Sequence, residues 1–136
     1  MTPAREQFAS ARIARLATVG AGGVPHLVPV VFTVADDTIY MCVDHKPKRT
    51  RQLRRLANIT ANPAVSMLAD HYAEDWTALW WVRVDGHAEI VDADSEVGAE
   101  AIDLLAAKYH QYRANRPDGQ VIVVRALRWS SWSASS

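Results

Sequence analysis

A basic stretch in the first half of the chain has the residue types best suited to binding an anion. Six lysine and arginine side chains fall between Lys46 and Arg55, with no acidic residue among them. The stretch lies where an expected strand ends and an expected helix begins, and helix N-termini present free backbone N–H groups and a positive dipole end. Lys46, Lys48 and Arg49 add formal charge there and Thr50 adds a hydroxyl donor, which together suit a phosphate or a carboxylate. The alternative is a solvated charged face without a ligand.

Tryptophan is the second candidate, with five copies in 136 residues. Trp76, Trp80 and Trp81 cluster before and within one expected strand, and Trp129 and Trp132 lie near the end of the sequence. They could form an aromatic wall for a planar cofactor, but core packing or a subunit interface is the interpretation we favour for any single tryptophan. Because neighbours on a strand alternate in direction, Trp80 and Trp81 are expected to face opposite ways, so at most one lines any given surface.

Other chemistry finds no support in the spacing of residues. The five histidines show no short paired spacing such as HxxxH, and Cys42 is the one cysteine, so we expect no metal site. The sequence contains no GxSxG, Walker A or GxGxxG motif, and the glycines of 20–23 join two expected strands as a hairpin. Asp70, Glu74 and Asp75 are expected in a solvated loop. No nucleophile or general acid can be nominated from the residues alone.

Short strands and a few helices must position these side chains. Three helices are expected. The first has Thr2 as its cap and Pro3 as its first residue and ends at about Ser10. The second is the basic segment with Leu53 and Leu56, which ends at Asn62-Pro63, and the third covers 94–112 with Asp94 or Ser95 as its cap. The expected strands are 12–19, 25–34, 38–43 after a turn at Asp36-Asp37, 64–69, a strand within the run 76–91, and 121–132.

Three local features refine these elements. Pro29 cannot donate a hydrogen bond to a strand ladder, so it implies a sheet edge, a bulge or a strand break. The run after Trp76 alternates as a half-buried strand, with Asp85-Gly86 as a bend or bulge. Arg54 and Arg55 lie further along the basic helix, where we expect surface or salt-bridge roles.

The order of elements predicts a mainly β protein. Short strands of antiparallel type predominate and turn signals are closely spaced, which fits a small antiparallel β-barrel with peripheral helices in a single domain, residues 1–136. A doubly wound parallel sheet fits poorly, because strands do not alternate one for one with helices.

Composition and charge narrow the function classes. The chain is 49% apolar, which is globular, and its 15 basic and 15 acidic residues give zero net charge, which argues against a general nucleic-acid binder. The charge is uneven, because residues 1–68 hold nine basic and four acidic side chains. One cysteine, no signal peptide and no apolar run of about 18 residues predict a soluble, cytoplasmic protein in a reducing compartment that does not bind membranes.

Three segments together resemble the flavin and deazaflavin split-barrel family, the superfamily of pyridoxamine 5′-phosphate oxidase. They are ARLATVGAGGVPHLVPVVFTV at 14–34, DHKPKRTRQLRRLANITANPAVSMLADHY at 44–72 and DWTALWWVRVDGHAEIV at 75–91. Within this family, KPKRTRQLRR and DHYAEDWTALWWVRVDG resemble most closely the actinobacterial branch that uses the deazaflavin coenzyme F420. The R-x-x-x-L-K phosphate motif of the FMN oxidases is absent.

The resemblance implies a split β-barrel homodimer with two cofactor sites at the subunit interface. It implies that the strand at 27–32 runs along the cofactor ring, that the basic segment holds the phosphate of the cofactor tail, and that the partner subunit completes the ring pocket. The implied cofactor-binding residues are Val28, Pro29 and Val30 at the ring, Lys46, Lys48, Arg49, Thr50 and Arg51 at the phosphate, and Trp76, Trp80 and Trp81 from the partner. Lys48, Arg49 and Thr50 are the strongest of the phosphate contacts.

The leading hypothesis is therefore an F420-dependent oxidoreductase that transfers a hydride from the reduced deazaflavin to an organic small molecule. The cofactor supplies the chemistry, so the lack of a catalytic triad is no objection. Two alternatives on the same fold are an FMN-dependent oxidase or reductase and a non-catalytic F420-binding protein. A basic module that binds nucleic acid is a further alternative, against which the acidic second half of the chain argues.

Overall fold

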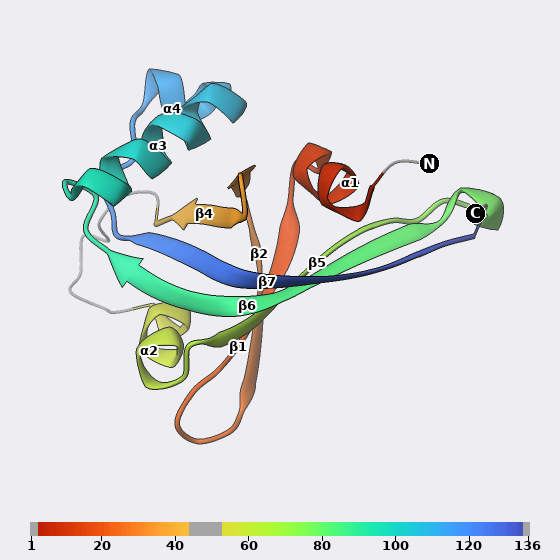
Figure 1. The fold of residues 1–136 in the computed structure, drawn as a ribbon, viewed down its shortest axis with the longest axis horizontal. Coiled ribbons are helices and arrows are strands. Elements are labelled where there is room, and N and C mark those ends of the chain that lie inside the picture. The colour runs from red at the N-terminus through yellow and green to blue at the C-terminus, as the bar shows by residue number, and fades with distance from the viewer. Residues whose placement is uncertain (1–2, 44–52, 135–136) are drawn as a thin grey trace.

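One antiparallel sheet of seven strands carries most of the chain, and the helices lie around it (Figure 1). The computed structural model describes residues 3–43 and 53–134. The helices within these residues are α1 (Ala4–Ser10), α2 (Arg54–Ala61), α3 (Glu96–Lys108) and α4 (His110–Ala114), with a 3₁₀ turn η1 (Trp76–Ala78). The strands are β1 (Ala14–Val19), β2 (Pro25–Val30), β3 (Thr33–Ala35), β4 (Thr38–Cys42), β5 (Ala64–His71), β6 (Trp80–Val91) and β7 (Val121–Ser133).

Strand pairing confirms the expected mainly β split barrel. The sheet runs in the order β2-β1-β5-β6-β7-β4-β3, and every neighbouring pair is antiparallel. β2 and β3 are separated in the chain by only Val31 and Phe32, yet they lie at the two margins of the sheet. The sheet must therefore curl so that its margins approach each other at this link.

The hydrophobic core occupies the inner face of the curled sheet. Because side chains alternate along a strand, every second residue of the central strands points inward, and Leu16, Met67 and Val82 are fully buried. Phe8 of α1 and Phe32 of the β2–β3 link are also fully buried, with ring centroids 4.7 Å apart. Helix α1 is thus packed onto the core beside the link.

Pro29 lies in a marginal strand, where a residue without an N–H is tolerated. β2 ends one residue later at Val30, so the strand expected over 25–34 is interrupted at Val31 and Phe32 before β3 begins. Two of the three explanations offered for the proline, an edge position and a nearby strand break, are therefore confirmed.

The helix expected over 94–112 is broken at Tyr109, which corrects the prediction. Tyr109 has the extended dihedral angles φ −113° and ψ 110°, and α4 follows it at once. Its hydroxyl accepts a hydrogen bond from the backbone N–H of Phe32 at 3.2 Å and can donate to the carbonyl of Phe32 (2.9 Å) or of Arg12 (3.0 Å). These tertiary contacts outweigh the helical periodicity, which continues across the break.

The other helix ends differ from expectation only in detail. Ser95 caps α3 as predicted, because its Oγ accepts a hydrogen bond from the Gly98 N–H at 3.0 Å. Pro3, expected as the first helical residue of α1, is instead its N-cap. α2 begins at Arg54, so Leu53 stands just before the helix. None of the helices in the described residues is both long and apolar enough to cross a membrane.

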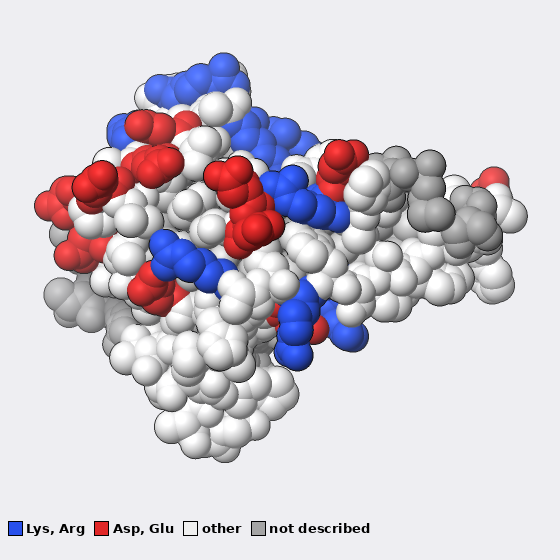
Figure 2. All heavy atoms as spheres, viewed as in Figure 1, with Lys and Arg blue, Asp and Glu red and all other residues white. Residues whose placement is uncertain are grey.

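The long strands β6 and β7 extend beyond the barrel together with the end of β5 (Figure 1). We call this extension, residues 68–83 and 129–134, the arm. At its base a register shift between Asp85 and His87 confirms the predicted bulge, and Ala126 opposite adopts a φ of 56°. Gly86 is required there, because a Cβ would lie 2.7 Å from the side chain of Val124. Figure 2 shows that charged side chains gather over the barrel and that the visible side of the arm is mostly uncharged.

Candidate functional site

The first candidate site is a pocket of about 360 Å³ beside the break between β2 and β3, which we call the strand-break pocket. Its lining residues come from the β2 end, from β4 and from the start of α2. They are Ile13, Pro29, Val30, Val31, Met41, Cys42, Val43, Leu53, Arg55, Tyr112 and Ile122. Pro29 and Val30, both predicted to contact a cofactor ring, therefore line it. Val28, the third residue predicted to contact the ring, is not among the lining residues, although it packs against the core as Val30 does.

The described residues on either side of the segment predicted to bind phosphate, residues 44–52, line this pocket. Val43 and Leu53 line the pocket, and residues 44–52 join them in the chain. The predicted phosphate contacts Lys46, Lys48, Arg49, Thr50 and Arg51 lie outside the described residues. Two residues of the strand predicted for the ring, Pro29 and Val30, therefore line the same pocket as Val43 and Leu53, the described residues on either side of that segment.

Arg55 is a residue of this pocket that the sequence reasoning missed. We expected only a surface or salt-bridge role for it, and the structure places it among the residues that line the pocket near the start of α2. It adds a guanidinium to an otherwise largely apolar wall. Its position two residues after Leu53 was the available signal, because the first turn of a helix lies closest to whatever binds at the helix N-terminus.

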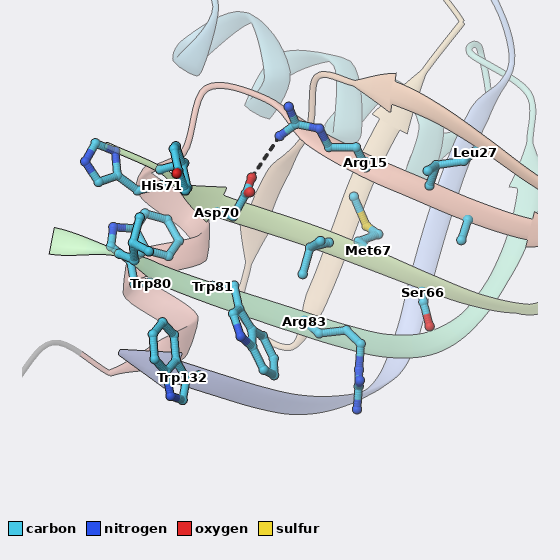
Figure 3. A pocket seen from close by; sticks show the side chains of 14 residues that line it. Arg15, Leu27, Ser66, Met67, Asp70, His71, Trp80, Trp81, Arg83 and Trp132 are labelled. Atoms are coloured by element: carbon cyan, nitrogen blue, oxygen red, sulfur yellow. Dashed lines mark hydrogen bonds and ion pairs between the residues drawn. The ribbon is translucent and has the colours of Figure 1, made fainter. Parts of the chain in front are cut away.

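The second candidate site is a pocket of about 540 Å³ on the outer face of the sheet, which we call the aromatic pocket (Figure 3). It is lined by residues of β1, β2, β5, β6 and β7, most of them with outward-facing side chains, and by residues on both sides of η1. They are Arg15, Ala17, Leu27, Ser66, Met67, Leu68, Asp70, His71, Tyr72, Leu79, Trp80, Trp81, Arg83 and Trp132. Trp132 was not among the predicted site residues.

Both Trp80 and Trp81 line the aromatic pocket, which contradicts the expectation that at most one of them could line a given surface. Trp81 lies opposite Trp132 on β7, as alternation predicts. Trp80 is the first residue of β6 and stacks on His71, with ring centroids 6.4 Å apart and 20° between the ring planes. The pocket reaches this end of the strand pair, where His71, Trp80 and Trp81 all line it (Figure 3). Trp76 is exposed on the arm and lies outside the pocket.

Both arginines of the aromatic pocket are engaged by carboxylates. Arg15 forms an ion pair with Asp70 at 3.1 Å (Figure 3), so Asp70 belongs to strand β5 and not to a loop. Arg83 lies 3.5 Å from a carboxylate oxygen of Asp85. Asp75 caps η1, and hydrogen bonds from the side chain and backbone of Thr77 lower the pKa of that carboxyl. None of these carboxylates stands as an acid and base pair, and the described residues contain no cluster of metal ligands.

The two pockets lie side by side on one chain but share no lining residue. Pro29 of the strand-break pocket pairs with Arg15 of the aromatic pocket across β1 and β2. The tryptophans predicted to cover a cofactor ring therefore line a different pocket from Pro29 and Val30 of the same chain. Within one chain the structure places the two predicted groups of site residues next to each other but does not join them.

The lysine and tyrosine at the break of the third helix support the strand-break pocket from behind. The Lys108 ammonium donates to the carbonyls of Ala9 (3.0 Å) and Ala11 (2.8 Å) and lies 3.9 Å from the centroid of the Phe32 ring. Burial, with the nearby Arg12 charge, lowers the pKa of Lys108 to about 8. Burial raises the pKa of Tyr109, so its hydroxyl keeps its proton and can donate to the link that shapes the pocket.

Comparison with known families agrees with this architecture. The sequence profile described as pyridoxamine 5′-phosphate oxidase matches residues 1–133, which is nearly the whole chain. Among curated protein sequences, none matches the chain significantly.

Several solved structures share the fold at low sequence identity. The heme storage protein HutZ of Vibrio cholerae is 19% identical, with a TM-score of 0.72 over 95% of this chain and 91% of that one. A conserved hypothetical protein from Mycobacterium tuberculosis is 22% identical, with a TM-score of 0.74 over 98% and 86% of the two chains. An FAD-binding protein from Mesorhizobium loti is 16% identical, with a TM-score of 0.64 over 94% and 90%. At these identities the likeness establishes the fold alone.

Proposed function

Because the chain belongs to the pyridoxamine 5′-phosphate oxidase family, we propose that it is an F420-dependent oxidoreductase that reduces an organic small molecule. The observation that carries the proposal is the strand-break pocket. Pro29 and Val30 line it, and so do Val43 and Leu53, between which the basic segment runs. A cofactor with a flat ring and a long anionic tail needs an apolar wall beside a cluster of cations.

The residues of this pocket fit such a cofactor. Its volume of about 360 Å³ falls within the usual range for small-molecule sites, and Val30, Val31 and Met41 give it an apolar wall. Arg55 and the cations of the basic segment would bind the anionic tail through charge-assisted hydrogen bonds. When bound in its reduced form, the coenzyme supplies a hydride from C5, and the acceptor takes up that hydride together with a proton. The chain itself orients the two reactants and excludes water.

The proposal includes a homodimer in which each aromatic pocket completes the cofactor site of the partner. Support comes from apolar side chains that are unusually exposed for their size: Leu27 (66%), Tyr72 (65%), Trp76 (66%) and Trp132 (47%). A contiguous exposed apolar surface of this kind marks an interaction site. In the dimer Trp76, Trp80 and Trp81 of one chain would cover the ring in the strand-break pocket of the other.

Flavin binding without F420 is the second candidate, and two observations favour it. The family is named for a flavin enzyme, and a neighbour of the same fold is described as FAD-binding. Storage or transport without turnover is the third, because HutZ is described as a heme storage protein. For each of these candidates, the residues of the strand-break and aromatic pockets would still bind the cofactor.

Titration with three ligands distinguishes these candidates. We expect purified protein to bind F420 more tightly than FMN or hemin, with quenching of the fluorescence of Trp80 and Trp81, and to oxidise reduced F420 when an acceptor is present. Tight FMN binding without F420 binding would refute the leading proposal. Tight F420 binding without turnover for any acceptor would favour the non-catalytic candidate.

Substitutions in the basic segment test the phosphate site. Lys48→Ala and Arg49→Ala should each weaken F420 binding about tenfold or more, because a hydrogen bond to a charged group contributes about 1.5–3 kcal/mol. Arg113→Ala is the matched control, since this exposed arginine of α4 lines neither pocket. Equal F420 affinity in all three variants would contradict the assignment.

A further inference from the structure

A third pocket, of about 580 Å³, lies on the outer face of the sheet next to the aromatic pocket. We call it the polar pocket. It is lined by Ala17, Val19, Asn62, Ala64, Val65, Ser66, Asp85, Gly86, His87, Ala126 and Arg128. Its walls therefore combine a guanidinium, an imidazole, a carboxylate, a hydroxyl and an amide, whereas the aromatic pocket has mostly apolar walls.

The polar and aromatic pockets form one continuous groove. Both are lined by Ala17 and Ser66, which pair with each other across β1 and β5. The same row of paired residues begins at Leu27 on β2 and continues through Asp85 on β6 to Arg128 on β7. The two side chains that the pockets share, Ala17 and Ser66, are small, so no bulky side chain separates the pockets at these two positions.

Arg128 lies at the polar end of this groove, and its charge is not used in an ion pair with a described residue. It lies opposite Asp85, but that carboxylate accepts a hydrogen bond from Ser66 and is paired with Arg83 at 3.5 Å. Among the described residues, neither Arg128 nor His87 has a hydrogen bond or an ion pair through its side chain. The guanidiniums of Arg83 and Arg128 beside one carboxylate leave one positive charge in surplus, and the Arg128 guanidinium offers N–H donors to a ligand.

We propose that this groove binds the acceptor and selects an elongated aromatic molecule that carries a carboxylate or another compact anion. The inference rests on the proposed function, whose substrate class it names. The aromatic portion lies against Trp81 and Trp132, and the anion accepts hydrogen bonds from Arg128 and His87. Trp132 is the fourth residue after Arg128 along β7, so the two ends of the ligand are about 13 Å apart at about 3.3 Å per residue.

This placement agrees with the proposed dimer. Trp81 is one of the residues that would meet the cofactor ring in the partner's strand-break pocket. An acceptor whose aromatic portion lies on Trp81 and Trp132 is therefore held beside that ring, while its anion is fixed at the far end of the groove. Arg128 acts on the ligand's position and affinity and takes no part in the transfer of the hydride.

The test is a calorimetric titration of the whole protein without cofactor, using biphenylbutanoate and its neutral primary amide as probes. The wild-type protein should bind the carboxylate about tenfold more tightly than the amide. Arg128→Gln should remove that preference and leave the amide affinity unchanged, because only the carboxylate uses the guanidinium. Trp132→Leu should weaken both probes alike, since both lose the aromatic contact.

Arg125→Gln is the matched control. Arg125 lies on the same strand, but its guanidinium is already engaged by Glu89 and it lines neither pocket, so the carboxylate preference should persist. A wild-type protein that binds the two probes equally, or an Arg128→Gln variant that keeps the preference, overturns the proposal.

F420 titrations of the same variants separate this proposal from the proposed function. Arg128→Gln should bind F420 as the wild type does, because Arg128 does not line the strand-break pocket. If no variant binds F420 but the carboxylate preference depends on Arg128, the groove stands and the proposed function fails. If F420 binds and the Arg128→Gln substitution does not change the binding of the two probes, the proposed function stands and the groove proposal fails.

Discussion

Removing the hydroxyl of Tyr109 should destabilise the fold and loosen the strand-break pocket. Tyr109→Phe deletes the acceptor of the Phe32 N–H and the donor to the carbonyls of Phe32 and Arg12. Phe32 is fully buried, so its N–H finds no replacement partner in water. The ring of residue 109 is retained, and the change therefore reports the polar contacts of one atom.

The expected cost follows from these contacts. A buried N–H without a partner costs about 1–3 kcal/mol, and the lost hydroxyl hydrogen bond contributes about 0.5–1.5 kcal/mol. We expect the free energy of unfolding to fall by about 2.5 kcal/mol. With an m-value of about 1.5 kcal/mol/M, the urea midpoint would fall by about 1.7 M.

Equilibrium urea unfolding followed by tryptophan fluorescence measures this change. Tyr72→Phe is the control, because Tyr72 loses the same atom, but within the described part of the chain its hydroxyl accepts a hydrogen bond from Trp76 alone, on the exposed arm. That variant should differ from the wild type by less than about 0.5 kcal/mol. Val30 and Val31 precede Phe32 and line the strand-break pocket, so Tyr109→Phe should also weaken cofactor binding. A Tyr109→Phe midpoint equal to that of Tyr72→Phe would refute the role given to this hydroxyl.

Two further predictions concern the same helices and the turn between β1 and β2. Burial and the Arg12 charge lower the pKa of Lys108 to about 8, so between pH 8 and about 10.5 the unfolded chain binds more protons than the folded one. The wild type should therefore gain stability with rising pH relative to Lys108→Met. If urea titrations give a difference in unfolding free energy that is constant across this range, the reasoning is wrong. Gly98→Ala should destabilise by about 2 kcal/mol or more, because its Cβ would lie 2.0 Å from the Asp92 carbonyl oxygen, whereas Gly22→Ala, with no atom within 4 Å, should be neutral or slightly stabilising in the same assay.

Local features of the fold could be predicted from the sequence because local physics determines them. The alternation of β6, the bulge at Asp85-Gly86 and the Ser95 cap each depend on residues within a few positions of one another. Pro29 likewise predicted a strand at the margin of the sheet, because it has no N–H to donate to a neighbouring strand. These predictions held because no distant contact opposed them.

The failures share a different cause, which is contact between residues far apart in the chain. The break at Tyr109 depends on Phe32 and Arg12, and nothing in the periodicity of 94–112 reveals those partners. The groove depends on the pairing of Ala17 with Ser66, which strand register alone decides. Alternation also misled at Trp80, the first residue of β6, which lines the same pocket as Trp81.

Several residues of the candidate site could be predicted from the sequence, but which residues come together in one pocket could not. The resemblance assigned Pro29, Val30 and the basic segment to one cofactor, and residues on both sides of that segment line the pocket that Pro29 and Val30 share. Arg55 and Trp132 were not predicted, because their roles follow from which strands lie next to each other in space. Sequence separation concealed these contacts.

The order of strands in the sheet also dictates when the barrel can close during synthesis. β1 and β2, and likewise β3 and β4, can pair as soon as they are made, since each pair is adjacent in the chain. β1 must then wait for β5, and β4 has no further partner until Val121–Val124 of β7 leave the ribosome. Two separate hairpins with uncovered apolar faces therefore precede the barrel, and the last strand made is the one that joins them. Substitutions in β7 should accordingly affect the yield of folded protein in cells more than their effect on the finished structure suggests.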